Sequence, residues 1–322
     1  MLFENFFDVL INFFGALTKY TFLQRALITS IIVGVICGLV GVFIILRGLV
    51  FMGAGIAHSS FAGGALGILI GINPFITIFL FSTGAAMTIG FINEKGYIED
   101  KNVAVGIIFS LTMALAILFI SLIKTYNAAV TAILFGNVLI VTTEDMVLLI
   151  SISIIIIMIV FFMKKELFFI TFDDEMARAT GLPVKFVSYI FLILISLAIV
   201  VSLKAIGAIL VFAMITTPAA AAYQWSYKLN RIILLSILFG AVSSFVGLYL
   251  SYILNLPSGS TITMIVTSIF VVSIILSPKR RVSKDIGYKH MCKICDNVSI
   301  EECEFCLEEQ KTKNSINEIM ES

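Results

Sequence analysis

His58 is the residue whose type and surroundings point most clearly to chemistry. It lies in the apolar stretch 52–93, which is long enough for two membrane spans. A neutral imidazole is a good ligand for zinc, manganese or iron, and a polar group inside a membrane usually faces a bundle interior or a water path. The alternative is a buried histidine that is hydrogen bonded to a neighbouring group such as the hydroxyl of Ser59 or Ser60. We therefore treat His58 as a candidate ligand of an ion in transit.

Four cysteines near the carboxyl end form a second candidate site. Cys292 and Cys295 make one C-x-x-C pair, and Cys303 and Cys306 make another after seven intervening residues. Four thiolates at this spacing fit a tetrahedral Zn²⁺ site. An iron–sulfur cluster is the main competitor, and a disulfide is disfavoured in a reducing compartment. We expect a Zn²⁺ site that senses or buffers cytoplasmic metal, with a small structural zinc knot as the alternative.

A charged insertion between two apolar stretches predicts a short helix over residues 172–180. Asp174 and Arg178 are spaced to pair along it, and Gly181 can take the left-handed conformation that ends a helix before Pro183. Such a helix suits docking into a groove on a partner, and a solvated loop is the alternative. The residues concerned are Phe172, Asp173, Asp174, Glu175, Met176, Ala177, Arg178, Ala179 and Gly181.

Pro218 interrupts a shorter apolar stretch at 206–224. It removes a helix hydrogen bond and frees the carbonyl of Met214, which the hydroxyls of Thr216 and Thr217 could satisfy. Broken helices often border a translocation path, although many kinks are only structural. Thr216, Thr217 and Pro218 are therefore candidates for the lining of a pore.

Membrane helices must position these residues. A spanning helix takes roughly 20 apolar residues, and the clearest such segments are 25–46, 102–123, 144–163, 184–203, 229–254 and 259–277. Residues 52–93 hold two more, joined at a turn signal near Pro74, and 206–224 hold another. The sequence thus predicts eight or nine membrane helices.

The composition agrees with a protein surrounded by lipid. Hydrophobic residues make up 60% of the chain and charged residues 13%, against about half and about 25% in soluble domains. The apolar runs do not alternate with polar residues, which argues against a β-barrel, and backbone groups in hydrocarbon then require helices. A net charge of +1 gives no reason to expect a nucleic-acid partner. The predicted fold class is an all-α integral membrane protein, a polytopic bundle with a small Cys-rich tail.

Basic residues set the expected orientation. Lys and Arg gather at 164–185, at 228–231 and at 279–284, and the positive-inside rule assigns these stretches to the cytoplasm. The expected domains are an interfacial amphipathic segment, a membrane domain and a cytoplasmic tail that carries the four cysteines, at residues 1–22, 23–278 and 279–322.

Two classes of activity can be weighed from the residues. A secondary metal transporter driven by an ion gradient would need acidic residues at the middle of the membrane, whereas Glu94, Glu144 and Asp145 lie at the ends of spans. A membrane enzyme such as a metalloprotease would need more metal ligands. The chain has neither a Walker phosphate loop nor a His-Glu-x-x-His motif. We therefore expect no enzyme, and any ATP hydrolysis is expected in a partner subunit.

Five stretches in this order resemble the permease family of zinc, manganese and iron ABC importers. They are Met-Gly-x-x-x-x-His at 52–58, Phe-Gly-Asn-Val-Leu at 135–139, Asp-x-Glu-Met-Ala-Arg-Ala-x-Gly at 173–181, the segment 207–220 and Leu-Pro-Ser-Gly-Ser-Thr at 256–261. The resemblance covers about residues 25–278. It implies a homodimer of permeases in the plasma membrane, with two ATPase subunits, an extracellular metal-binding protein and no cofactor in the membrane domain.

The resemblance also assigns roles to residues. Residues 172–182, called the coupling segment below, match the short cytoplasmic helix that couples such permeases to the ATPase. His58 matches the histidine of the pore. The family commonly has an aspartate four residues before that histidine, and here the position is Ala54. The resemblance therefore leaves the metal open, and His58 of a second protomer is an expected further ligand.

Overall fold

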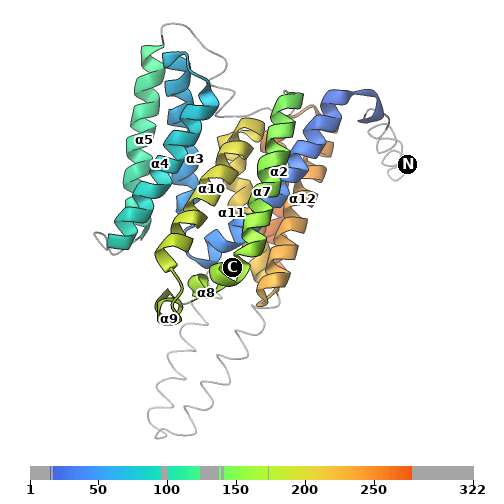
Figure 1. Cartoon of the computed structure of the whole chain (residues 1–322). Helices are drawn as coiled ribbons and strands as arrows, with labels where there is room; N and C mark the ends of the chain where they lie inside the picture. The colour runs from blue at the N-terminus through green and yellow to red at the C-terminus, as the bar shows by residue number, and fades with distance from the viewer. Residues whose placement is uncertain are drawn as a thin grey trace, which may run out of the picture. The chain divides into compact units, whose positions relative to one another are not determined.

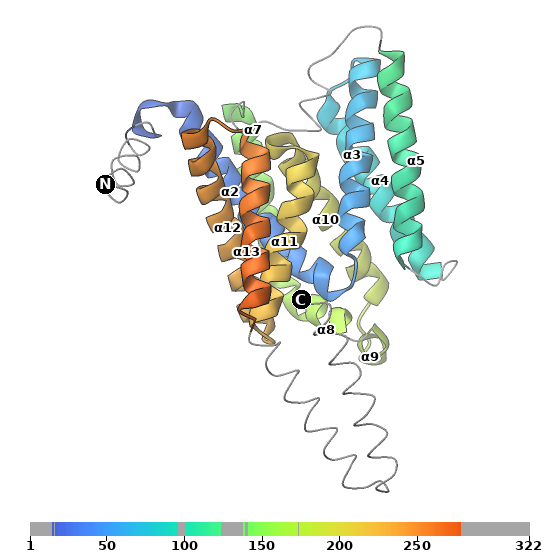
Figure 2. The ribbon, with the colours of Figure 1, turned by 180° about the vertical axis from the view of Figure 1, so that it is seen from behind.

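The computed structural model describes residues 15, 17–95, 101–123, 138, 141–172 and 174–277. These residues form helices joined by short turns, with no strand among them (Figures 1 and 2). The chain divides into two compact units, Met1–Ile275 and Leu276–Ser322, and all the helices described below belong to the first. They are α2 (Thr21–Leu46), α3 (Val50–Ile70), α4 (Pro74–Lys95), α5 (Lys101–Leu122), α7 (Thr143–Phe162), α8 (Lys164–Phe172), α9 (Asp174–Ala179), α10 (Val184–Ile206), α11 (Ala208–Trp225), α12 (Leu229–Leu254) and α13 (Ser258–Ile275).

Eight of these helices are long and apolar enough to cross a membrane, namely α2, α3, α4, α5, α7, α10, α12 and α13. Their outer surfaces are apolar as well: Phe161 and Phe162 at the end of α7 are 74% and 75% exposed. Exposed aromatic side chains in this number suit contact with lipid. For the described residues the predicted all-α bundle is confirmed, and the eight candidate spans agree with the lower of the two predicted numbers, eight or nine.

α11 completes the path of the chain. α10 starts directly after α9, and the start of α12 lines one cavity together with α8. The chain must therefore return between α10 and α12, and α11 is the helix that makes this return. It packs against α2, α12 and α13, so it lies inside the bundle, and it occupies the shorter apolar stretch 206–224 without being among the eight helices named above as long and apolar enough to cross a membrane.

Glycines let α2 cross its neighbours closely. A Cβ on Gly34 would lie 2.6 Å from the carbonyl oxygen of Gly240 in α12, and a Cβ on Gly41 would overlap the carbonyl oxygen of Ile215 in α11. At the same crossing Ser236 donates a hydrogen bond of 2.7 Å to the carbonyl oxygen of Gly38. Since lipid provides no hydrophobic drive for association, such close backbone approach is what holds membrane helices together.

A second group joins α3, α4 and α5. A Cβ on Gly63 would lie 2.5 Å from the carbonyl oxygen of Thr77 in α4, and Gly67 faces the hydroxyl of the same threonine. On the other side of α3, the hydroxyl oxygens of Ser59 and of Thr112 in α5 lie 3.2 Å apart. A further bond of 3.2 Å between Thr83 and Ser196 connects α4 to α10. The small residues of α3 thus lie where helices approach one another, and they fix the position of His58.

Two predicted domains fall largely outside the described residues. Residues 1–14 of the amphipathic segment 1–22 are not among them, and neither are Pro278 and the whole tail 279–322 with Cys292, Cys295, Cys303 and Cys306. These two domains stay predictions. Of the membrane domain, the structure describes Thr21 to Ser277 except residues 96–100, 124–137, 139–140 and 173, so the stretch 135–139 lies outside the described residues apart from Val138.

Candidate metal pathway and coupling segment

His58 lies on the accessible face of α3. Between Met52 and Ala65 only Ala54 and His58 are not buried, and they are one helical turn apart on the same face. The other residues of this stretch face α4, α5 and α11: Gly55 packs on Val105, and Gly53 lies near Phe212 and Ile215. Ala54 and His58 therefore form the one strip of α3 between Met52 and Ala65 that neighbouring helices leave partly uncovered.

The imidazole of His58 has an acceptor or donor position without a protein partner. Its Nδ1 is buried and makes no hydrogen bond to the described residues. The hydroxyls of Ser59 and Ser60 instead donate to the carbonyl oxygens of Gly55 and Ile56, at 2.7 and 2.8 Å. Phe109 of α5 packs edge-to-face on the ring, with 4.8 Å between the centroids. Among the described residues, Nδ1 therefore lacks the hydrogen bond to a neighbouring hydroxyl or carbonyl that a purely structural role of His58 would lead one to expect.

Acidic residues do not accompany His58. The described residues contain no cluster of three or more His, Cys, Asp or Glu side chains that could hold a metal ion. Glu94 and Asp145 lie at the ends of α4 and α7. Within the part of the chain that the structure describes, one protomer thus offers a single imidazole at this depth.

α11 contains Pro218 but runs as one helix. Thr216 donates a hydrogen bond of 3.0 Å to the carbonyl oxygen of Phe212, so this hydroxyl does not serve the carbonyl of Met214, which was the expectation. The sulfur of Met214 accepts a bond from Ser243 of α12. Pro218 is buried, while Thr216 and Thr217 are half-buried. The two threonines therefore keep partial access, as a lining position requires.

The coupling segment is helical, but differently from the prediction. The sequence predicts one helix over 172–180, whereas the structure has α8 ending at Phe172 and the separate α9, with Asp173 and the side chains of Asp174 and Glu175 outside the description. Helical backbone begins already at Lys164, because Leu167 and Ile170 are buried against the bundle.

The end of α9 follows the predicted pattern. Gly181 has a left-handed φ of 81°, and the N–H groups of Gly181 and Leu182 donate to the carbonyls of Arg178 and Ala177 at 3.0 and 3.2 Å. Ala177 is fully buried, while Phe172 and Met176 are each 63% exposed. The coupling segment therefore contains a helix that is held to the bundle through Ala177, with the apolar side chains of Phe172 and Met176 exposed, and it is not a solvated loop.

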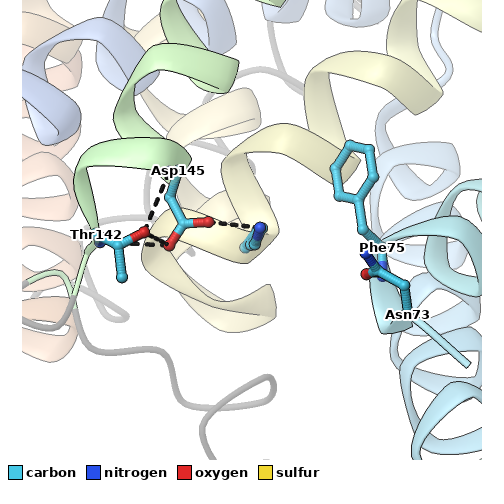
Figure 3. Close-up of polar contacts among 5 residues, drawn as sticks. Asn73, Phe75, Thr142 and Asp145 are labelled. Atoms are coloured by element: carbon cyan, nitrogen blue, oxygen red, sulfur yellow. Dashed lines mark hydrogen bonds and ion pairs between the residues drawn. The ribbon is translucent and has the colours of Figure 1, made fainter. Parts of the chain in front are cut away.

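A polar network at the opposite end of the helices was not predicted (Figure 3). Asp145 in the first turn of α7 exchanges hydrogen bonds with Thr142, and its carboxylate lies 2.5 Å from the ammonium of Lys204 in α10. Lys204 also lies 5.6 Å from the ring centroid of Phe75 at the start of α4. The capping pattern of Thr142 and Asp145 is readable in the sequence, but nothing there pairs Asp145 with Lys204.

Comparisons with known proteins agree with these features. The sequence model of the ABC 3 transport family matches residues 19–277. A manganese transport system membrane protein of Listeria monocytogenes is 45% identical over 268 residues, covering 83% of this chain and 95% of that protein. The manganese import system permease protein ScaB of Streptococcus gordonii is 40% identical, covering 85% and 98%.

A solved structure supports the same relationship. PsaBC from Streptococcus pneumoniae, in complex with Fab, contains a chain with a TM-score of 0.77 and 38% identity, and the match covers 85% of this chain and 99% of that one. The residues that the family model matches, 19–277, include His58, the coupling segment and α11. The chain therefore belongs to the ABC 3 transport family and is a permease of the metal-ion ABC importer type.

Proposed function

We propose that this chain is the permease subunit through which an ATP-driven importer carries a divalent metal ion across the plasma membrane, with manganese as the first candidate. Support for manganese comes from the relatives, whose names assign them to manganese transport or import. Zinc and iron remain the competing cargoes, because imidazole binds all three.

The observation that carries this proposal is the buried Nδ1 of His58, which has no hydrogen-bond partner among the described residues although the side chain as a whole is only half-buried. A polar nitrogen buried without a partner is costly in a membrane, and a transient ligand would offset that cost. A single imidazole binds weakly, which suits an ion that must also leave. In a homodimer the second protomer would add its own His58, giving two nitrogen ligands in place of the usual histidine and aspartate.

The energy would come from separate ATPase subunits that contact the coupling segment. Phe172 and Met176 offer apolar anchors, and Arg178 offers a charge, on a ridge that is fixed to α8 and α10. ATP-driven closure of these subunits would move α8 and α9, and with them the helices that border His58. An extracellular metal-binding protein would deliver the ion to the end of the bundle that carries Lys204, and the tail would face the cytoplasm.

Uptake in reconstituted vesicles tests this function. The permease is reconstituted with its ATPase subunits into vesicles that contain ATP. Uptake of radioactive manganese, zinc and iron is then measured for the wild type, for His58→Ala and for His58→Gln, whose side chain is similar in size to histidine. We expect ATP-dependent uptake that falls at least about tenfold in both variants. Equal uptake by all three proteins removes His58 from the pathway, and uptake that needs a proton or sodium gradient instead of ATP contradicts the importer.

For the tail we propose a Zn²⁺ site formed by Cys292, Cys295, Cys303 and Cys306, since four thiolates in two C-x-x-C pairs are a complete tetrahedral donor set. Elemental analysis of the full chain should find one zinc per chain, and replacing all four cysteines by serine should remove it. Iron and inorganic sulfide in the purified protein would instead indicate an iron–sulfur cluster. Unchanged feedback of cytoplasmic metal on uptake in the serine variant would rule out a sensing role.

A further inference from the structure

A basic cavity lies where α8 meets the start of α12. Its volume is about 640 Å³, and its lining residues are Lys164, Lys165, Phe168, Phe169, Lys228, Leu229, Asn230 and Arg231. On α8 the two lysines are one turn from the two phenylalanines, so charge and aromatic surface share one face. This cavity, called the basic pocket below, collects four cations that are distant in the sequence.

The four cations have no counter-ion among the residues that the structure describes. The ion pairs found there join Lys185 to Glu94 and Lys204 to Asp145. Glu166, in the first turn of α8, does not line the pocket, and its Oε2 is buried without a hydrogen-bond partner. Cations held together repel one another, so a bound anion would stabilise this arrangement.

Backbone dipoles act in the same direction. α12 is a helix of 26 residues, its first turn carries no acidic side chain, and its N-cap residue Lys228 makes no side-chain capping bond. The positive end of this helix therefore opens at the basic pocket together with the side-chain charges. An oxyanion with several acceptor atoms, such as a phosphate, matches these donors.

The position of the basic pocket favours a lipid as the source of this phosphate. The apolar helix α7 ends at Phe162, and Lys164 follows after one residue. Phe161 and Phe162 are exposed just before the pocket, and the apolar helix α12 begins at its other wall. The cations therefore lie at the level where membrane helices end and headgroups begin, next to a surface that acyl chains can cover.

We propose that the basic pocket binds the phosphate of an anionic phospholipid headgroup, whose acyl chains lie along the exposed apolar surface at the end of α7. The site lies beside the coupling segment, since α8 forms one wall of the pocket and leads directly to α9. It needs neither His58 nor the transported metal.

Lipid titration of the purified full chain in a neutral detergent tests the proposal. Binding of short-chain phosphatidylglycerol is compared with that of phosphatidylcholine of the same chain length and with inorganic phosphate. We expect saturable binding of phosphatidylglycerol that is at least about tenfold tighter than that of the other two. Lys165→Gln/Arg231→Gln removes one cation from each wall and should weaken it roughly thirtyfold, since each cation near an anionic lipid is worth about one kcal/mol.

A matched variant separates the pocket from net charge. Lys19→Gln/Lys95→Gln removes two charges from residues that do not line the pocket, and it should bind phosphatidylglycerol like the wild type. Equal weakening in both double variants, or equal binding of the two lipids, overturns the proposal. Inorganic phosphate binding as tightly as phosphatidylglycerol shows a free-phosphate site and overturns the lipid. If Lys165→Gln/Arg231→Gln, the pocket variant, loses association with the ATPase but binds lipid like the wild type, these cations contact the partner protein and not a lipid.

If the pocket variant does not fold, as judged by size-exclusion chromatography, the single substitutions Lys165→Gln and Arg231→Gln replace it. Each is then expected to weaken phosphatidylglycerol binding about fivefold. No weakening in either single variant contradicts the proposal.

Discussion

At the scale of single residues, the alanine at position 54, where the family commonly has an aspartate, can be tested directly. Ala54 and His58 share the accessible face of α3 one turn apart, so an aspartate at 54 would place a carboxylate beside the imidazole. Manganese favours oxygen ligands, and we expect Ala54→Asp to lower the concentration for half-maximal manganese uptake by about tenfold, or ~1.4 kcal/mol.

The control for this prediction is Ala54→Asn, which has nearly the same shape without the charge. It should leave manganese uptake close to that of the wild type. A gain of equal size with asparagine would mean that space or polarity at position 54, and not a metal-binding carboxylate, limits transport.

The sequence identifies His58 as a candidate ligand, but it does not predict the hydrogen-bond partners of the polar residues around it. His58 stands out because it is the one ionisable side chain of its span, but the course of the Ser59 and Ser60 hydroxyls depends on helix backbone geometry. Thr216 likewise bonds to Phe212 in its own helix. Short polar side chains inside helices usually donate to a backbone carbonyl one turn earlier in the same helix. This rule predicts the bond of Thr216 correctly, whereas the expected bond to the carbonyl of Met214 is not formed.

At the scale of elements, the crossing of α2 with α12 predicts a sharp difference between two glycines. A Cβ at Gly34 would meet the carbonyl oxygen of Gly240, whereas a Cβ at Gly84 in α4 would meet nothing within 4 Å. Gly34→Ala should destabilise the protein by about 1–3 kcal/mol through overpacking, and Gly84→Ala should stabilise it by up to about 1 kcal/mol. Thermal unfolding in detergent measures both, and equal effects would contradict the close crossing.

The polar network around Asp145 gives a second prediction for elements. Asp145 caps α7 and also pairs with Lys204, whose side chain is 41% exposed, so the ion pair itself contributes little. Asp145→Ala should therefore lower stability by about 1 kcal/mol more than Lys204→Ala, because it also removes the cap. Glu144→Ala, which changes the neighbouring acid in the same turn, should have almost no effect on the unfolding temperature. Equal losses for Asp145→Ala and Lys204→Ala would show that the cap contributes nothing.

Element boundaries followed from composition wherever lipid was the solvent. Twenty apolar residues specify a membrane helix regardless of neighbours, and this is why the long spans were predicted within a few residues. α8 was missed because Lys164, Lys165 and Glu166 suggest a solvated loop, and only the packing of Leu167 and Ile170 makes this stretch a helix. The basic pocket was missed for the same reason, since its two walls meet only in the folded bundle.

At the scale of the whole molecule, the order of the helices explains where charge gathers. The chain leaves α7 at the end that carries Lys164 and Lys165, goes out through α10, returns through α11 and starts α12 at Lys228 and Arg231. All these cations therefore lie at one end, as the positive-inside rule requires. The coupling segment lies at that end too, so the site proposed for an ATPase and the site proposed for an anionic lipid are neighbours.

This arrangement predicts that the exposed side chains of the coupling segment contact the ATPase without contributing to the fold of the bundle. Met176 is 63% exposed, whereas Ala177 next to it is fully buried. A charge at 176 would be solvated in the isolated permease and buried in the complex, where an unpaired charge is costly. Met176→Glu should therefore leave the unfolding temperature nearly unchanged, abolish co-purification with the ATPase subunits and reduce ATP-dependent uptake at least about tenfold.

Met176→Leu, which keeps the apolar surface, should behave like the wild type. Normal assembly and uptake in the glutamate variant would place the contact with the ATPase elsewhere on this end of the molecule.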